Sequence, residues 1–246
     1  MDAVSASQCP QQVSRIWRSV AAHALRGASV LVAGATAGIG SAMARELARR
    51  GATLTLVARN ARRLEDLAVP GIRHACDLRS PRACEEAVAA AERLDVLVNC
   101  VGVVAFGAVT ELSDATLEEL FRTNVFVAIL LARAALPVLQ RGGAIVNISG
   151  VIAERNLPGM AAYGASKPAV RSFDEALARE ARHSAIRVLD ARPPHTDTGL
   201  AGRAIEGSAP KMPAGLSAES VAVAICDALE RGSTDLPSSD FAAGRR

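Results

Sequence analysis

The chain has 246 residues, of which 50% are hydrophobic, and its 28 basic and 25 acidic side chains leave a formal charge of +3. This length predicts one domain with a full hydrophobic core. The near balance of charge argues against a nucleic-acid partner, and no apolar run reaches the roughly 18–20 residues of a membrane span. The five scattered cysteines show no metal-ligand spacing. We therefore expect a cytoplasmic protein without nucleic-acid or membrane partners and without a metal site.

The first 26 residues precede the main pattern of the chain. They lack a compact apolar stretch behind a basic start, so no signal peptide is predicted. Apolar residues recur at helical spacing over 11–25, which predicts an amphipathic helix. We interpret 1–26 as an N-terminal helical extension and 27–246 as the main domain.

Short apolar segments then alternate with amphipathic ones. Strands are predicted at 29–33, 53–58, 72–76, 96–99, 144–148 and 186–191. Helices are predicted at 39–50, 62–67, 82–93, 114–140, 160–183 and 218–230. Strands that are apolar at every position are buried on both faces, so the pattern predicts a doubly wound, Rossmann-type α/β domain with a parallel sheet of about seven strands.

One long irregular stretch covers residues 192–217 and includes Pro193, Pro194, Pro210 and Pro213. It follows the carboxyl end of a predicted strand, which is the edge where such sheets bind ligands. Loops of this length are usually functional or disordered, and we interpret this one as a substrate lid.

A glycine-rich turn leaves the first strand and opens the first helix. Gly34, Gly38 and Gly40 would let the backbone approach a pyrophosphate at the helix N-terminus. The spacing is GxxxGxG rather than GxGxxG, and taken alone the turn is equally consistent with an ordinary tight turn.

The end of the second strand bears on cofactor choice. Sites for NAD commonly place an acidic residue there to bind the ribose 2′-hydroxyl, whereas this chain has Ala58 followed by Arg59. A guanidinium suits a 2′-phosphate, so we expect NADP(H) to be favoured over NAD(H). The alternative is that Arg59, Arg62 and Arg63 form a solvated helix start.

Tyr163 is the only tyrosine, and Lys167 is one of only two lysines in a chain that otherwise uses arginine. Residues four apart share a helix face, so the phenol and the ammonium are expected to lie together. A nearby cation lowers a phenol pKa and makes the phenol a better general acid or base. By itself such a pair is common on protein surfaces.

These features together resemble the short-chain dehydrogenase/reductase family. The similarity runs over about residues 28–191 and covers Gly34-x-x-x-Gly38-Ile39-Gly40, Asp77-Leu78, Asn99-Cys-Val-Gly102, Asn124, Ile145-Val-Asn-Ile-Ser149 and Tyr163/Lys167. The family resemblance implies a nicotinamide-dependent oxidoreductase of the carbonyl reductase or alcohol dehydrogenase type, acting on a small molecule. It also implies a homodimer or homotetramer.

The resemblance also implies how the cofactor is bound. The three glycines would line the pyrophosphate with Ile39 beside them. Asp77 and Leu78 would hold the adenine edge, and Asn99 and Gly102 would border the adenosine ribose.

The same resemblance implies the catalytic roles. Tyr163 would exchange a proton with the substrate oxygen. Lys167 would bond the nicotinamide ribose and lower the pKa of the tyrosine. Asn124 would anchor a water in a proton relay, and Thr198 would meet the nicotinamide carboxamide.

One departure from the family pattern concerns the catalytic serine. The family places it thirteen residues before the tyrosine, and that position here is Gly150. Ser149 is the nearest hydroxyl, but neighbouring residues of a strand point to opposite faces. Losing one such donor typically costs roughly 10²–10³ in rate.

Three interpretations stay open at this point. The protein is a reductase that uses another donor (Ser149 after a shift, Thr196, His195 or the substrate itself), a weakly active cofactor-binding scaffold, or a protein whose tyrosine performs non-redox proton transfer or cyclisation. Glu154 and Arg155 are further candidates for contacting the substrate.

Overall fold

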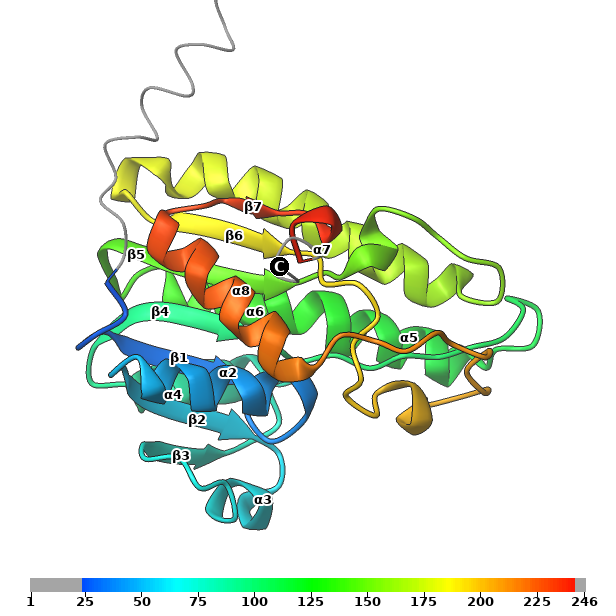
Figure 1. The fold of residues 1–246 in the computed structure, drawn as a ribbon, viewed down its shortest axis with the longest axis horizontal. Helices are drawn as coiled ribbons and strands as arrows, with labels where there is room; N and C mark the ends of the chain where they lie inside the picture. Colours follow the sequence, from blue (N-terminus) through cyan, green and yellow to red (C-terminus); the bar gives the residue numbers. More distant parts are fainter. Residues whose placement is uncertain (1–23, 242–246) are drawn as a thin grey trace, which may run out of the picture.

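The computed structural model describes residues 24–241, which form a seven-stranded parallel sheet of order β3-β2-β1-β4-β5-β6-β7 (Figure 1). The strands are β1 (Ser29–Ala33), β2 (Thr53–Ala58), β3 (Ile72–Ala75), β4 (Leu94–Asn99), β5 (Leu139–Ile148), β6 (Arg187–Ala191) and β7 (Asp235–Leu236). The order reverses next to β1, so the doubly wound fold predicted from sequence is confirmed. The predicted extension falls outside the described residues, except for residues 24–26.

Helices cover both faces of the sheet (Figure 1). One face carries α2 (Gly38–Arg49) and α8 (Ala218–Arg231), which pack on each other, while α4 (Pro81–Ala89), α6 (Val127–Ala135) and α7 (Ala161–Glu180) lie on the other. Along β1, Val30 and Val32 belong to the first core and Leu31 and Ala33 to the second. Within residues 24–241, no helix combines the length and apolar character needed to cross a bilayer.

The predicted helix over 114–140 is wrong at its C-terminal end. The chain forms α5 (Asp114–Phe121), a π-helical turn η1 (Arg122–Phe126) and α6, which ends at Ala135. Pro137, which has no backbone N–H to continue the helix, follows at once, and β5 begins at Leu139. The short helix α3 (Ala61–Glu65) lies where a helix was expected, whereas the two-residue β7 was not located from the sequence.

A row of polar residues crosses the sheet near the carboxyl ends of its strands. Asn99 of β4 pairs in register with Asn147 of β5, and Asn147 pairs with Asp190 of β6. The Asn99 amide donates to Asn147 at 2.9 Å, and the Asn147 amide donates to Asp174 of α7 at 2.6 Å. These buried bonds tie β4, β5 and α7 together at the edge where ligands bind in such folds.

Asp174 itself is buried, and its second carboxyl oxygen has no hydrogen-bond partner. Burial raises the pKa of this carboxyl well above its ordinary value of 3.8. The folded state therefore keeps a proton that the unfolded state releases above about pH 4, so this group makes stability fall as pH rises.

We expect Asp174→Asn to increase the free energy of unfolding at pH 7 by at least about 1 kcal/mol, since the variant removes this linkage at little change in shape. Urea denaturation at pH 5, 6 and 7 measures the effect, which should grow with pH. A variant whose stability falls with pH as steeply as that of the parent would contradict the assignment.

Candidate active site

A cavity of about 520 Å³ lies at the carboxyl ends of the strands and collects most of the residues predicted from sequence. The predicted residues that line it are Gly34, Gly38, Ile39, Arg59, Asp77, Leu78, Gly102, Ser149, Tyr163, Lys167 and Thr198. These residues come from segments far apart in the chain, which the sheet brings to one edge.

The glycine turn is built so tightly that side chains are excluded. A Cβ on Gly40 would lie 2.1 Å from the Gly34 carbonyl oxygen, and one on Gly34 would lie 3.0 Å from the Cys100 carbonyl. Gly34 and Gly38 also have positive φ angles of 79° and 51°. No side chain caps the N-terminus of α2, so its first turn presents backbone N–H groups beside the cavity. This cradle fits a pyrophosphate.

Arg59 and Arg63 line the cavity at the end of β2. The side chain of Asn60, between them, caps α3 by accepting from the Arg63 backbone N–H at 3.0 Å. Asp77 follows β3 and accepts from Arg79 at 2.6 Å, and this hydrogen bond lowers the pKa of the Asp77 carboxyl. This end of the cavity is therefore rich in guanidinium groups.

Tyr163 and Lys167 lie one turn apart on α7 and both face the cavity. The Lys167 ammonium donates to the Ile148 carbonyl at the end of β5, at 2.8 Å. Burial lowers the pKa of Lys167 to about 8 and raises that of Tyr163 to about 12. The direction for Tyr163 is opposite to the expectation, because burial outweighs any effect of the neighbouring cation.

Three predicted residues support the cavity wall from behind rather than lining it. Gly40 packs under Gly34, and Asn99 bonds Asn147. Asn124, in the π-helical turn η1, accepts from the Val103 N–H at 2.8 Å and donates to the Val103 carbonyl at 3.0 Å.

The Asn124 amide also donates to the Ser166 hydroxyl at 3.0 Å, which links η1 to α7. A Cβ on Gly102 would lie 3.3 Å from the Asn124 side-chain oxygen and 3.5 Å from the Lys167 ammonium nitrogen. Glycine at 102 therefore allows the backbone to pass close to both groups.

Ser149 and Gly150 occupy the turn after β5. The Ser149 hydroxyl is fully buried and donates to Asp190, so it is not free to serve a substrate oxygen. Gly150 has φ 84° and ψ 165°, a region that is essentially restricted to glycine. An added Cβ would nevertheless have room, since its nearest neighbour is the Pro193 carbonyl oxygen at 3.9 Å. The backbone conformation, rather than the available space, disfavours a serine here.

One of the other expected donors near this turn, Thr196, is also engaged. The Thr196 hydroxyl donates to the Pro194 carbonyl at 2.8 Å. The Gly150 and Val151 N–H groups donate to the Ala191 and Pro193 carbonyls. His195 lines the cavity, with its Nε2 3.5 Å from the Asp197 carboxylate.

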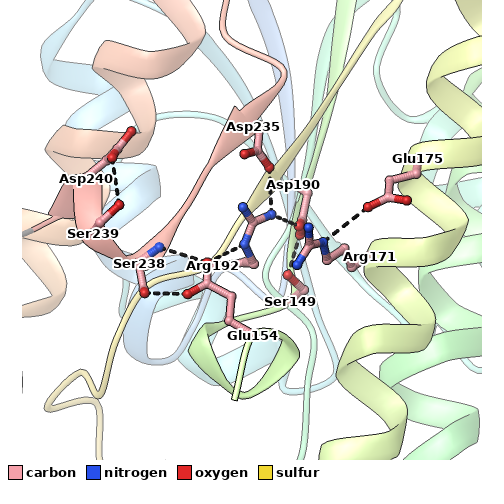
Figure 2. A network of polar contacts seen from close by, with 10 residues as sticks. All are labelled: Ser149, Glu154, Arg171, Glu175, Asp190, Arg192, Asp235, Ser238, Ser239 and Asp240. Carbon is pink, nitrogen blue, oxygen red and sulfur yellow. Dashed lines mark hydrogen bonds and ion pairs between the residues drawn. The ribbon is translucent and has the colours of Figure 1, made fainter. Parts of the chain in front are cut away.

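An ion network centred on the buried Arg192, behind this turn, was missed by the sequence analysis (Figure 2). The Arg192 guanidinium contacts Asp190, Glu154 at 2.6 Å and Asp235 at 2.7 Å. Glu154 also accepts from the Ser238 hydroxyl, at 2.5 Å. Glu154 is therefore a structural partner of Arg192 and does not line the cavity, and neither does Arg155. The sequence signal that could have revealed this network is the presence of Asp190 within β6 and of Arg192 just after it, in an otherwise mostly apolar strand.

The predicted lid closes over the glycine turn. Residues 193–196 and parts of 198–212 line the cavity, and Thr196 bridges to Leu216. A Cβ on Gly38 would lie 2.8 Å from the Thr198 Cβ, which places Thr198 directly against the turn.

Comparison with known proteins identifies the class. A family model described as short chain dehydrogenase matches residues 28–208. The chain is 32% identical over 214 residues to dehydrogenase/reductase SDR family member 7B of Bos taurus, covering 79% of this chain and 66% of that protein. It is 34% identical over 197 residues to 3-ketodihydrosphingosine reductase of Mus musculus, covering 72% of this chain and 59% of that protein. The chain thus spans about two thirds or less of the length of these two relatives.

A solved structure agrees with this assignment. The short-chain dehydrogenase from Sphingobium yanoikuyae in complex with NADPH superposes with a TM-score of 0.78 at 30% identity, over 85% of this chain and 87% of that one. The chain therefore belongs to the short-chain dehydrogenase/reductase family, whose members are NAD(P)-dependent oxidoreductases.

We expect Gly150→Ala and Gly150→Ser each to lower the free energy of unfolding by about 1–3 kcal/mol, because both force a side chain into a glycine-only backbone region. Chemical denaturation measures this loss. A change below about 0.5 kcal/mol in both variants would show that the turn relaxes freely.

Proposed function

We propose that the protein is a cytoplasmic, homo-oligomeric, NADP(H)-dependent oxidoreductase that interconverts a small-molecule carbonyl and its alcohol. The observation that carries the proposal is that Tyr163 and Lys167 face the same cavity as the glycine turn and Arg59. A proton donor thus lies at one end of a cavity whose other end is suited to a phosphorylated dinucleotide.

The residues fit a nicotinamide cofactor. The side-chain-free cradle at Gly34 and Gly38 would hold the pyrophosphate, and Arg59 would bind a 2′-phosphate. Lys167 would hold the nicotinamide ribose, and Thr198, which lies against the glycine turn, would contact the carboxamide. When bound, the cofactor supplies the hydride of the reaction.

Reduction breaks the carbonyl π bond and forms one C–H and one O–H bond. The carbon receives two electrons and a hydrogen as hydride, the reduced cofactor is oxidised, and the oxygen receives a proton from the Tyr163 hydroxyl. A phenol with a pKa of about 12 is protonated at neutral pH, which favours the proton-donor role over the base role. Tyr163 then regains its proton from solvent, with Asn124 as a proposed anchor of the relay.

A second candidate function follows from Gly150. Because its backbone disfavours the family's serine, the substrate oxygen lacks one donor, and Tyr163 then serves non-redox proton transfer or cyclisation. Fluorescence titration with NADPH, paired with NADPH-consumption assays on a carbonyl panel, separates the two functions. Tight binding with turnover supports the reductase, tight binding without turnover supports the second candidate or a weakly active cofactor-binding scaffold, and no binding contradicts all three.

We expect Gly150→Ser to reduce a carbonyl substrate about tenfold faster than Gly150→Ala, because only serine adds a hydrogen-bond donor for the substrate oxygen. One well-placed donor contributes a factor of roughly 10²–10³ in rate, and the strained backbone at this position should reduce that gain. The alanine variant controls for the shared backbone strain. Equal rates would show that another group already serves the substrate oxygen.

We expect Arg59→Ala to weaken NADPH binding at least tenfold, because it removes a charge-assisted bond to the 2′-phosphate, while NADH binding changes little. Fluorescence titration at fixed moderate salt gives both dissociation constants. Arg62→Ala is the matched control, since Arg62 is exposed on α3, three residues after Arg59, and does not line the cavity. An equal loss for both cofactors would contradict a 2′-phosphate contact.

We expect kcat/KM for carbonyl reduction to be constant below about pH 7.5 and to fall above pH 8 by up to tenfold per unit. Lys167, whose pKa is lowered to about 8 by burial, loses its charge over this range, whereas Tyr163 stays protonated. Lys167→Arg should be slower but should lack this decline, because a guanidinium stays charged. A decline that persists unchanged in Lys167→Arg would assign it to another group.

A further inference from the structure

The part of the cavity beyond Tyr163 is walled almost entirely by apolar side chains. Val104, Phe106, Ile152 and Met160 form a buried cluster, each at most 7% exposed, and Tyr163 packs against them. Leu157 and Ile205 line the same space but are 42% and 37% exposed. We call these six residues the apolar chamber.

The chamber joins three separate segments. Val104 and Phe106 follow β4, while Ile152 lies in the 3₁₀ turn η2 (Val151–Ala153) after β5. The lid is fastened to the first segment, because the Ile205 N–H donates to the Val104 carbonyl at 2.9 Å and the Phe106 N–H donates to the Glu206 carbonyl at 3.0 Å. These backbone hydrogen bonds therefore hold the lid side of the apolar chamber in place.

None of the six residues of the chamber is charged, although His195 and Arg203 line the same cavity. Glu154, the acidic residue next to η2, is bound to Arg192 and Ser238. Among the lining residues that the structure describes, the acidic side chain is Asp77, which lies with Arg59 and Arg79 at the end of the cavity assigned to the cofactor. Arg203 is exposed in the lid and donates to the Thr198 carbonyl at 3.2 Å. A charged group placed among these six residues would therefore lose hydration without gaining a partner there.

Two members of the chamber are exposed, Leu157 before α7 and Ile205 in the lid. We infer that the chamber opens to solvent between them, since both also line the cavity. Apolar side chains at such an opening are unfavourably exposed to water, and an alkyl chain of the substrate that leaves the chamber there would bury them.

We propose that the substrate is an uncharged ketone or secondary alcohol with a largely apolar skeleton, whose longer arm crosses the chamber and leaves between Leu157 and Ile205. This inference rests on the proposed oxidoreductase function and specifies its substrate class. The carbonyl oxygen meets Tyr163, and selectivity comes from burying the carbon skeleton.

A series of methyl ketones tests the proposal on the full chain with NADPH. From 2-butanone through 2-hexanone to 2-decanone, kcat/KM should rise about fourfold for each methylene that becomes buried. 5-Oxohexanoate, which is 2-hexanone with its terminal methyl replaced by a carboxylate and is short enough to keep that charge within the chamber, should be at least tenfold poorer than 2-hexanone. A flat series, or a preference for the oxo acid, overturns the proposal, and turnover of 2-butanone in that case leaves the oxidoreductase function standing.

The double variant Leu157→Ser/Ile205→Ser tests the exit path. Both positions are exposed, so the fold should tolerate the change, and the ratio of kcat/KM for 2-decanone to that for 2-butanone should fall at least tenfold. Val223→Ser is the matched control, because Val223 is 39% exposed on α8 and does not line the cavity. An unchanged ratio in the double variant contradicts the exit between Leu157 and Ile205.

Calorimetry separates a failure of this inference from a failure of the proposed function. If NADPH binds but no ketone is reduced, titration of 2-decanone and 2-butanone into the NADP⁺-loaded protein measures the chamber directly. Tighter binding of 2-decanone supports the substrate class although the redox function fails. Equal affinities, or no binding of either ketone, overturn the substrate class.

Discussion

The buried guanidinium of Arg192 holds together the strand ends on which the site depends. It contacts the carboxylates of Asp190 on β6, Glu154 after β5 and Asp235 on β7. Asp190 also accepts a hydrogen bond from the Ser149 hydroxyl. A buried charge of this kind does not need to stabilise the fold overall, because desolvation offsets much of the attraction. Removing one of the carboxylates would lower stability, however, because the buried Arg192 charge would lose a partner. This requirement favours the one arrangement of the three segments that brings all three carboxylates to Arg192.

The consequences of this network reach the catalytic pair. With Ser149 bonded to Asp190, the chain turns at Gly150 through a backbone conformation that only glycine adopts easily. Just before the turn, the Ile148 carbonyl accepts from Lys167. The backbone conformation at Gly150 and the position of Lys167 are thus linked through one short turn, residues 148–150.

Local patterns in the sequence predicted the strands, the glycine turn and the shared cavity of Tyr163 and Lys167. Each of these features is set by residues close together in the sequence, and few folds other than a parallel α/β sheet combine apolar strands with a glycine turn that opens a helix. The helix over 114–140 was extended too far because apolar periodicity continues past Pro137 into β5. A strand of only two residues, such as β7, is too short to show any periodicity in the sequence. Two partners of Arg192, Glu154 and Asp235, lie more than 35 residues away in the chain, so no local pattern contains the whole network.

Burial at the substrate end links the remaining properties of the site. The apolar side chains around Tyr163 remove water from its hydroxyl, and this desolvation raises the pKa that a neighbouring cation would otherwise lower. The same surroundings strengthen the hydrogen bond that the protonated phenol donates to a carbonyl oxygen. In the proposed reaction they would also favour substrates that need little hydration. A site that lacks one polar donor would then depend on the apolar chamber, in which a single phenol both orients the carbonyl and supplies its proton.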